Sequence, residues 1–250
     1  TIHSLFQLPP QLFLPTPEAR RQLFSEMQMR AQKQRILRNL ELLIIDEVSM
    51  VRSDMLDTID AVLRHIKHQP NHPFGGIQVL MIGDLFQLSP VAREEDWRIL
   101  QDYYSGPYFF QALVFQQLNP VYIELDHVFR QTNQGFVHLL NQVRNNTLTP
   151  QSLQLLNTRY LPDFKVEEQD QHYITLSTHN HKVDAINQRE LDELPGKSYQ
   201  FVATIKDTFT ESMYPMDEVL TLKLGARVMF TKNDSSAEKR YYNGKLGIVS

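Results

Sequence analysis

Two acidic residues, Asp46 and Glu47, directly follow the apolar run Leu42–Ile45. One carboxylate can hold a hydrated magnesium ion, and its neighbour can orient the water that attacks a nucleoside triphosphate. Such a short, wholly apolar run is typical of a strand buried on both faces of a parallel sheet. Because α/β sheets bind ligands at the carboxyl ends of their strands, the acidic pair is well placed for nucleotide chemistry. The alternative is that two acids merely favour the N-terminus of the next helix.

Two further polar residues follow apolar runs in the same way. The run at residues 77–82 leads into a loop with Gln87, a side chain that could sense the γ-phosphate. An ordinary exit from a strand into a loop is the alternative. Arg130 follows an apolar stretch at 121–125 and could neutralise charge on a transferring phosphate across a cleft. A lone arginine is, however, more often a solvated surface residue.

The spacing of apolar residues predicts the elements that would position these side chains. Leu56, Ile59, Leu63 and Ile66 predict a helix between the first two strands, and hence a βαβ unit. A second α/β unit is predicted downstream. It comprises strands at 121–125 and 173–176, and helices at 136–143, after the N-cap and proline at 149–150, and at 181–194. Short strands at 199–205, 226–231 and 246–249, with a turn at 243–244, predict part of a small β-barrel. Near the N-terminus, prolines rule out one continuous helix.

The composition is that of a soluble globular protein with 250 residues, 42% of them hydrophobic. The absence of cysteine excludes disulfides, thiolate zinc sites and a cysteine nucleophile. A net charge of −4 gives no global attraction for nucleic acid, although a local basic face is compatible with it. No apolar run could cross a bilayer, and the residues after Thr1 do not form a secretory leader. We expect a cytosolic chain, excised from a longer one.

Seven segments occur in an order and at spacings that resemble the PIF-family and RecD-like DNA helicases of superfamily 1. They are TIHSLF at 1–6, DEVSM at 46–50, GDLFQLSPV at 83–91, FRQ at 129–131, LSTHNHKVDAIN at 176–187, GARVMF at 225–230 and YNGKLGIV at 242–249. The resemblance spans nearly the whole chain. Ser89 departs from it, since the family usually has proline there.

The resemblance implies an α/β fold with two RecA-like, P-loop NTPase-type domains on parallel sheets. The first domain would be incomplete and occupy residues 1–119, with a small wedge-type insertion at about 7–38. The first part of the second domain would occupy residues 120–194. Part of an SH3-like β-barrel would follow at 195–250.

The implied activity is that of an ATP-dependent DNA helicase that moves 5′-to-3′ on single-stranded DNA and uses ATP and Mg²⁺. Asp46 would hold magnesium through water and Glu47 would be the hydrolytic base, while Gln87 and Arg130 would contact the γ-phosphate. These four residues would be both the catalytic and the nucleotide-binding set.

Single-stranded and forked DNA are the implied partners, with no membrane partner and a monomeric chain. The residues implied to meet DNA are Thr1, His3, Phe86, Pro90, Val91, Thr178, Asn180 and His181. A basic run in or beside the wedge, which could equally be a solvated helix face, consists of Arg30, Lys33, Arg35 and Arg38. The implied processes are DNA repair, recombination and telomere maintenance. The implied location is the bacterial cytoplasm at the nucleoid, or the nucleus or mitochondria of a eukaryote.

The phosphate-binding loop of the family, G-x-x-x-x-G-K-[ST], is expected before Thr1, and the last motifs beyond Ser250. The triplet GKS at 196–198 does not form this motif, because Leu191 stands where the first glycine is required. The chain alone is therefore not expected to hydrolyse ATP. Two other readings stay open: a nucleotide-free DNA- or protein-binding module derived from such helicases, and a magnesium-dependent nuclease built on Asp46, Glu47 and Asp84.

Overall fold

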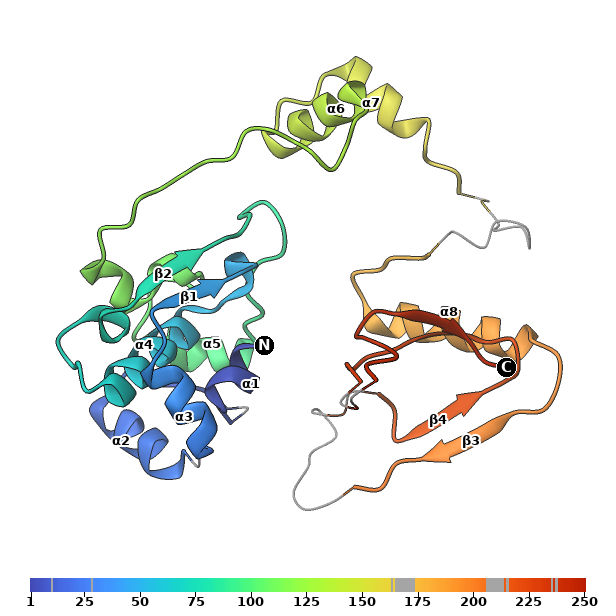
Figure 1. Ribbon diagram of the computed structural model, residues 1–250. Coiled ribbons are helices and arrows are strands. Elements are labelled where there is room, and N and C mark those ends of the chain that lie inside the picture. The colour runs from blue at the N-terminus through green and yellow to red at the C-terminus, as the bar shows by residue number, and fades with distance from the viewer. Residues whose placement is uncertain are drawn as a thin grey trace. The chain divides into compact units, whose positions relative to one another are not determined.

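The computed structural model describes residues 1–9, 11–27, 29–162, 164, 174–205, 214, 216–234, 236 and 238–250. The chain forms two compact units, Thr1–Tyr160 and Leu161–Ser250 (Figure 1). The predicted domains end instead at residues 119 and 194, and those boundaries stay a prediction. None of the helices in the described part of the chain is long and apolar enough to cross a membrane.

A βαβ unit lies at the centre of the first unit, as predicted. Strands β1 (Leu42–Ile45) and β2 (Gln78–Met81) pair in parallel, with Leu42 opposite Gln78 and Ile45 opposite Met81. Helix α4 (Ser53–Lys67) connects them, and Figure 1 shows it beside the two strands. Its four predicted core residues are all buried, which confirms the helical spacing. Both strands therefore run toward the same edge of the sheet.

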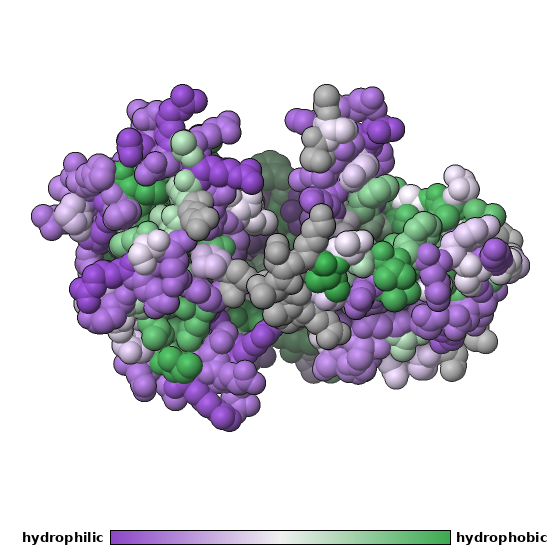
Figure 2. Space-filling view, turned by 90° about the horizontal axis from the view of Figure 1, so that it is seen from below, coloured by the Kyte–Doolittle hydropathy of each residue, from purple (hydrophilic) through white to green (hydrophobic). Residues whose placement is uncertain are grey.

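The prediction that β1 is buried on both faces is wrong. Leu43 and Ile45 are buried in the core, whereas Leu42 is half-exposed and Ile44 is 55% exposed. Side chains of a strand alternate between two faces, and the described residues cover only one face of this two-stranded sheet. Apolar side chains of this strand consequently reach the surface. On the face that Figure 2 shows, apolar side chains (green) lie between polar ones (purple).

Among the described residues, three helices precede β1, and prolines between the first two prevent one continuous helix, as predicted. They are α1 (Ile2–Phe6), α2 (Pro17–Glu26) and α3 (Ala31–Arg38). The side chain of Thr16 caps α2 by accepting a hydrogen bond from the backbone of Ala19. Pro17 is the first helical residue, where the missing N–H costs nothing. Leu23 and Leu37 anchor α2 and α3 in the core.

The remaining helices of the first unit lie between and after the strands. The α-helices are α5 (Glu94–Leu100), α6 (Gln134–Arg144) and α7 (Pro150–Asn157). Four 3-10 helices are η1 (Val48–Met50), η2 (Pro73–Gly76), η3 (Phe109–Gln111) and η4 (Leu113–Gln117). The two helices predicted in this region, at 136–143 and after the Thr149 cap, are confirmed.

The strand predicted at 121–125 is wrong. These residues form no regular structure, and Val121, Ile123 and Leu125 are 75–87% exposed. A strand needs a neighbour that pairs with its backbone N–H and C=O groups. None of the described residues pairs with this stretch, so its apolar pattern alone does not make it a strand.

The described residues of the second unit form one helix and four short strands. Helix α8 (Asn180–Glu193) confirms the helix predicted at 181–194 to within one residue at each end. Strand β3 (Tyr199–Val202) pairs antiparallel with β4 (Val219–Leu222), and β5 (Arg227–Met229) pairs antiparallel with β6 (Leu246–Ile248).

The predicted β segments of this unit are confirmed in part. Each of the three contains a strand, but β4 was not predicted. Gly244 has φ +90°, a left-handed conformation that suits glycine in the predicted turn between β5 and β6. The two pairs are separate sheets among the described residues, so an SH3-like barrel stays a prediction. Of the strand predicted at 173–176, Tyr173 lies outside the described residues and 174–176 form no strand, because no described segment pairs with them.

Candidate functional site

The chain leaves β1 and β2 at one shared edge of the sheet. The backbone N–H of Ile82 donates to Ile45 O at 2.9 Å, and that of Val48 donates to Ile82 O at 2.9 Å. These bonds continue the strand pairing past the last residue of each strand. They place Asp46 and Glu47 beside the start of the loop that carries Gln87.

Glu47 occupies a sharp turn between β1 and η1. Its backbone is left-handed, with φ 52° and ψ 43°, and its N–H donates to Asp46 Oδ1 at 2.9 Å. A side chain other than glycine, asparagine or aspartate seldom adopts this conformation, which costs about 1–2 kcal/mol. The turn leaves both acidic residues exposed. Within the described residues, the Glu47 carboxylate has no hydrogen-bond partner, and Asp46 has only this N–H.

Gly83 allows the two exiting chains to pass close to each other. A Cβ atom placed on Gly83 would lie 2.9 Å from Val48 Cγ1 and 3.0 Å from the backbone nitrogens of Val48 and Ser49. Real Cβ atoms essentially never approach another atom to less than 3.0 Å, and contacts at 3.0 Å are tighter than nine in ten of those they make. Glycine is therefore required here for contact, since it lets one backbone lie against the other.

Asp84 organises the loop at residues 83–91. Its carboxylate accepts hydrogen bonds from the backbone of Phe86 at 3.0 Å, from Gln87 Nε2 at 3.0 Å and from Arg144 Nη2 at 2.7 Å. Partial burial opposes ionisation of Asp84, but the bonds from Gln87 and Phe86 and the charge of Arg144 outweigh it and lower its pKa. The Gln87 side chain is thus fastened to an ionised carboxylate.

Arg144 is the residue of this region that the sequence reasoning missed. It is the last residue of α6, and its guanidinium also lies 4.8 Å from the centroid of the Phe86 ring. An arginine in the last turn of a helix is common, because it complements the helix dipole. The sequence therefore held no signal for a contact with a loop 60 residues away.

Arg130 is not brought to the other three nucleotide residues. It lies in an exposed stretch without regular structure, between η4 and α6. No hydrogen bond or ion pair in the described part of the chain joins it to Asp46, Glu47 or Gln87. Its role stays a prediction.

The residues predicted to meet DNA fall on both units. Thr1 caps α1 by accepting from the backbone of Ser4 at 3.3 Å, and His3 is exposed on that helix. Phe86 and Val91 are exposed on the loop, whereas Pro90 is buried. The other three are exposed at the start of α8 in the second unit: Thr178, Asn180 and His181.

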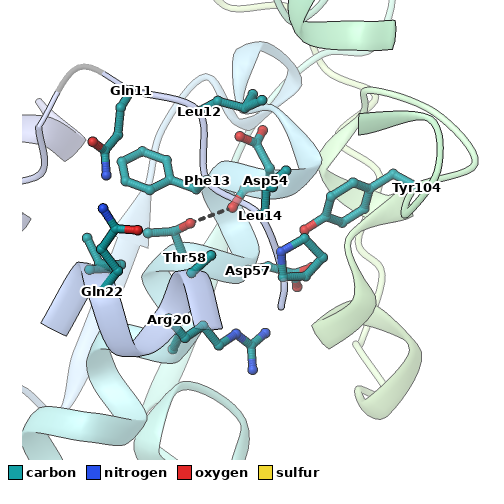
Figure 3. A pocket seen from close by; sticks show the side chains of 14 residues that line it. Gln11, Leu12, Phe13, Leu14, Arg20, Gln22, Asp54, Asp57, Thr58 and Tyr104 are labelled. Carbon is teal, nitrogen blue, oxygen red and sulfur yellow. Dashed lines mark hydrogen bonds between the residues drawn. The ribbon is translucent and has the colours of Figure 1, made fainter. Parts of the chain in front are cut away.

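A cavity of about 240 Å³ lies elsewhere in the first unit. The segment at 11–15, helices α2 and α4, and Tyr104 line it (Figure 3). Asp57 lies among its lining residues, where burial raises the carboxyl pKa despite the backbone N–H groups of Leu113 and Val114 that donate to it. None of the predicted site residues lines this cavity, so we do not assign the nucleotide to it.

The geometry of the described residues does not support the hypothesis of a magnesium-dependent nuclease. It requires Asp46, Glu47 and Asp84 to converge on metal ions, with two metals about 4 Å apart. Residues in the described ranges form no group of three or more His, Cys, Asp or Glu side chains that could hold a metal ion. Asp84 already binds Arg144 and Gln87.

Comparisons with known proteins agree on one family. The family model described as PIF1-like helicase matches residues 1–152. The human ATP-dependent DNA helicase PIF1 is 36% identical over 216 residues, which are 84% of this chain and 32% of that protein. The Pif1 helicase of Campylobacter jejuni is 31% identical over 225 residues, which are 86% of this chain and 47% of that protein. The chain thus spans between about a third and about half of these relatives.

Solved structures give the same result. Bacteroides Pif1 bound to single-stranded DNA matches with a TM-score of 0.83 and 43% sequence identity. The match covers 99% of this chain and 55% of that chain. A structure of two coordinating Pif1 helicases at forked double-stranded DNA has a TM-score of 0.81 and 43% identity, over 100% of this chain and 56% of its own. These similarities show a RecA-like α/β fold built on a parallel sheet.

Proposed function

The chain belongs to the PIF1-like helicase family, and from this premise we propose that it supplies the central part of an ATP-dependent DNA helicase. The observation that carries the proposal is the shared edge of β1 and β2, where two exposed carboxylates lie beside the loop of Gln87. Relatives that match most of this chain are ATP-dependent DNA helicases by name.

Asp46 and Glu47 divide the work of hydrolysis. One oxygen of Asp46 accepts the N–H of Glu47, which leaves the other oxygen for water molecules of a magnesium ion. Bound Mg²⁺ would neutralise charge on the phosphates. The Glu47 carboxylate, which has no partner among the described residues, accepts the proton of the attacking water. Gln87 and Arg130 contact the γ-phosphate.

Single-stranded DNA lies along the residues predicted for it on each unit. Thr1, His3 and the loop that carries Phe86 bind the DNA backbone and stack on its bases. The affinity for DNA therefore depends strongly on salt and little on base sequence. Related Pif1 structures contain single-stranded and forked DNA. A monomer finds no support there, since two helicases are described as coordinating at the fork.

Several finer points belong to the same proposal. They are 5′-to-3′ movement, an SH3-like barrel in the second unit, and the roles in repair, recombination and telomere maintenance. We also propose that the 250-residue chain alone does not hydrolyse ATP, because it contains no G-x-x-x-x-G-K-[ST] sequence.

The test compares two matched DNA duplexes, one with only a 5′ single-stranded tail and one with only a 3′ tail, in an unwinding assay with the complete natural protein. We expect ATP-dependent unwinding of the 5′-tailed duplex alone. Unwinding of only the 3′-tailed duplex would refute the 5′-to-3′ direction. Binding of single-stranded DNA without ATP hydrolysis would instead favour the nucleotide-free binding module.

A further inference from the structure

Arg144 joins helix α6 to the loop at 83–91 through two neighbouring residues. Its Nη2 donates to Asp84 Oδ1 at 2.7 Å, and its guanidinium lies 4.8 Å from the Phe86 ring centroid. The other Asp84 oxygen, Oδ2, accepts from Gln87 Nε2 at 3.0 Å. A continuous chain of contacts therefore runs from Arg144 through Asp84 to Gln87.

We propose that Arg144 is a positioning residue for hydrolysis, which sets the orientation of Gln87 through Asp84. The inference rests on the proposed function and adds a residue to it. Arg144 does not touch the nucleotide in this scheme. It acts only on the side chain that does.

The chemistry of the amide explains why orientation is at stake. An ionised carboxylate only accepts hydrogen bonds, so Asp84 must face the NH₂ group of Gln87 and not its carbonyl oxygen. One N–H of Gln87 Nε2 then donates to Asp84, and its second N–H is free to donate to the γ-phosphate. Without Arg144, Asp84 loses its cation and Gln87 loses the fixed partner that selects this orientation.

An arginine suits both contacts at once. The planar guanidinium can donate to a carboxylate and lie over an aromatic ring, whereas the ammonium of lysine is a compact point charge. Phe86 is 69% exposed and is a predicted DNA contact, and Gln87 follows it directly. Arg144 thus contacts Phe86, which is predicted to meet DNA, and positions through Asp84 the adjacent Gln87, which is predicted to meet the nucleotide.

The same contact contributes little to stability. The side chains of Arg144 and Asp84 are 45% and 20% exposed, and exposed ion pairs add little to the free energy of unfolding. A loss of activity on changing Arg144 would therefore report on positioning and not on unfolding.

The test is Arg144→Gln in the complete natural protein, assayed for ATP hydrolysis on single-stranded DNA. We expect kcat to fall roughly 10-fold to 100-fold, with KM for ATP within about 2-fold and the melting temperature unchanged. Arg144→Lys keeps the charge and should recover part of the loss. Arg98→Gln is the matched control, because Arg98 is an exposed helical arginine whose side chain pairs with Glu94 of the same helix.

A double variant tests the route through Asp84. If Arg144 acts through Asp84, Asp84→Asn combined with Arg144→Gln should lose no more activity than the worse single variant. Losses that multiply would overturn the relay, and a kcat of Arg144→Gln equal to that of the unaltered protein would overturn the inference as a whole.

The wild-type reaction separates this inference from the proposed function. If the complete protein does not hydrolyse ATP, the proposed function and this inference both fall. If it hydrolyses ATP, and Glu47→Gln abolishes turnover while Arg144→Gln has no effect, only this inference falls.

Discussion

Two sets of carboxylates in the first unit have opposite surroundings. Asp54, Asp57 and Asp60 lie on α4 and are 0–3% exposed. Asp46 and Glu47 follow β1 and are exposed. The side chains of the buried set bind other groups of the protein, whereas those of the exposed set accept, from the described residues, one hydrogen bond, from the Glu47 N–H to Asp46.

Two of the buried aspartates fasten other segments to α4, and the third pairs with the arginine that precedes the helix. Asp54 accepts from Arg52 at 2.6 and 2.9 Å. Asp57 accepts the backbone N–H groups at the start of η4, and Asp60 accepts that of Phe74 at 2.6 Å. Burial of a carboxylate is favourable only with such partners. Acids with partners therefore build the scaffold of this unit, while the acids without them stay exposed, as the proposed magnesium ligand and base require.

The largest expected effect is on the exposed set. Glu47→Gln in the complete natural protein should reduce the rate of ATP hydrolysis by about 10³-fold, because a general base is lost. Nucleotide binding and the melting temperature should not change, since the glutamine has the same shape and the site is exposed. Single-turnover hydrolysis and binding of a fluorescent nucleotide measure the two properties. Surviving turnover would show that Glu47 is not the base.

The next effect is on the buried set. Asp57→Ala in the 250-residue chain leaves the part-buried N–H of Leu113 and the buried N–H of Val114 without an acceptor, and should cost about 2–4 kcal/mol in the free energy of unfolding. Urea unfolding followed by the fluorescence of Trp97, the only tryptophan, measures it. Asp102→Ala, at an exposed acid, is the control and should stay within about 0.5 kcal/mol. Equal stability of the two variants would contradict the structural role of Asp57.

A change at the junction between the two sets should have a smaller effect. Gly83→Ala places a Cβ within 3.0 Å of the chain that follows Glu47, and should cost about 1–3 kcal/mol through overpacking. The same urea experiment measures this cost. Gly135→Ala in α6 is the matched control and should leave stability unchanged or raise it, because alanine favours helix and its Cβ makes only an ordinary contact. A neutral Gly83→Ala would mean that the two chains do not lie this close.

The smallest effect is a pH dependence of the buried set. Burial raises the pKa of Asp57 in the folded state above its ordinary value of 3.8. As the pH falls from neutral toward 4, the folded state therefore takes up a proton at Asp57 before the unfolded state does. The unaltered chain should gain stability relative to Asp57→Asn over this range. Urea unfolding of both chains at pH 7, 6 and 5 measures the difference, and a difference that is constant or shrinks on acidification would contradict it.

The βαβ unit could be predicted because its signals are local. Four apolar residues at helical spacing place α4 in the core, and a parallel pair on either side brings Asp46 and the Gln87 loop to one edge. The strands predicted at 121–125 and 173–176 had the same apolar signal, but residues 121–125 and 174–176 have no strand partner among the described residues. Strand formation depends on a neighbour, which an isolated segment does not reveal.

The contacts that sequence reasoning missed join residues far apart in the chain. Acids on a helix are ordinarily solvated, so nothing marked Asp57 as a buried ligand of backbone more than 50 residues away. Arg144 and Asp84 are 60 residues apart. The types of the site residues follow from the chemistry of phosphate transfer, whereas the side chains that hold them in place depend on the fold.

The hydrogen bonds between Asp57 and η4 also determine when the first unit can complete its folding during synthesis on the ribosome. Both strands and α4 are complete once residue 81 has been made, but the N–H groups that satisfy Asp57 belong to Leu113 and Val114. Val114 is itself part of the core. During translation, the nascent βαβ unit therefore lacks the segment that covers Asp57 and completes the core until 33 more residues have been added. Chaperones would meet this unit in that interval, with its apolar surface still uncovered.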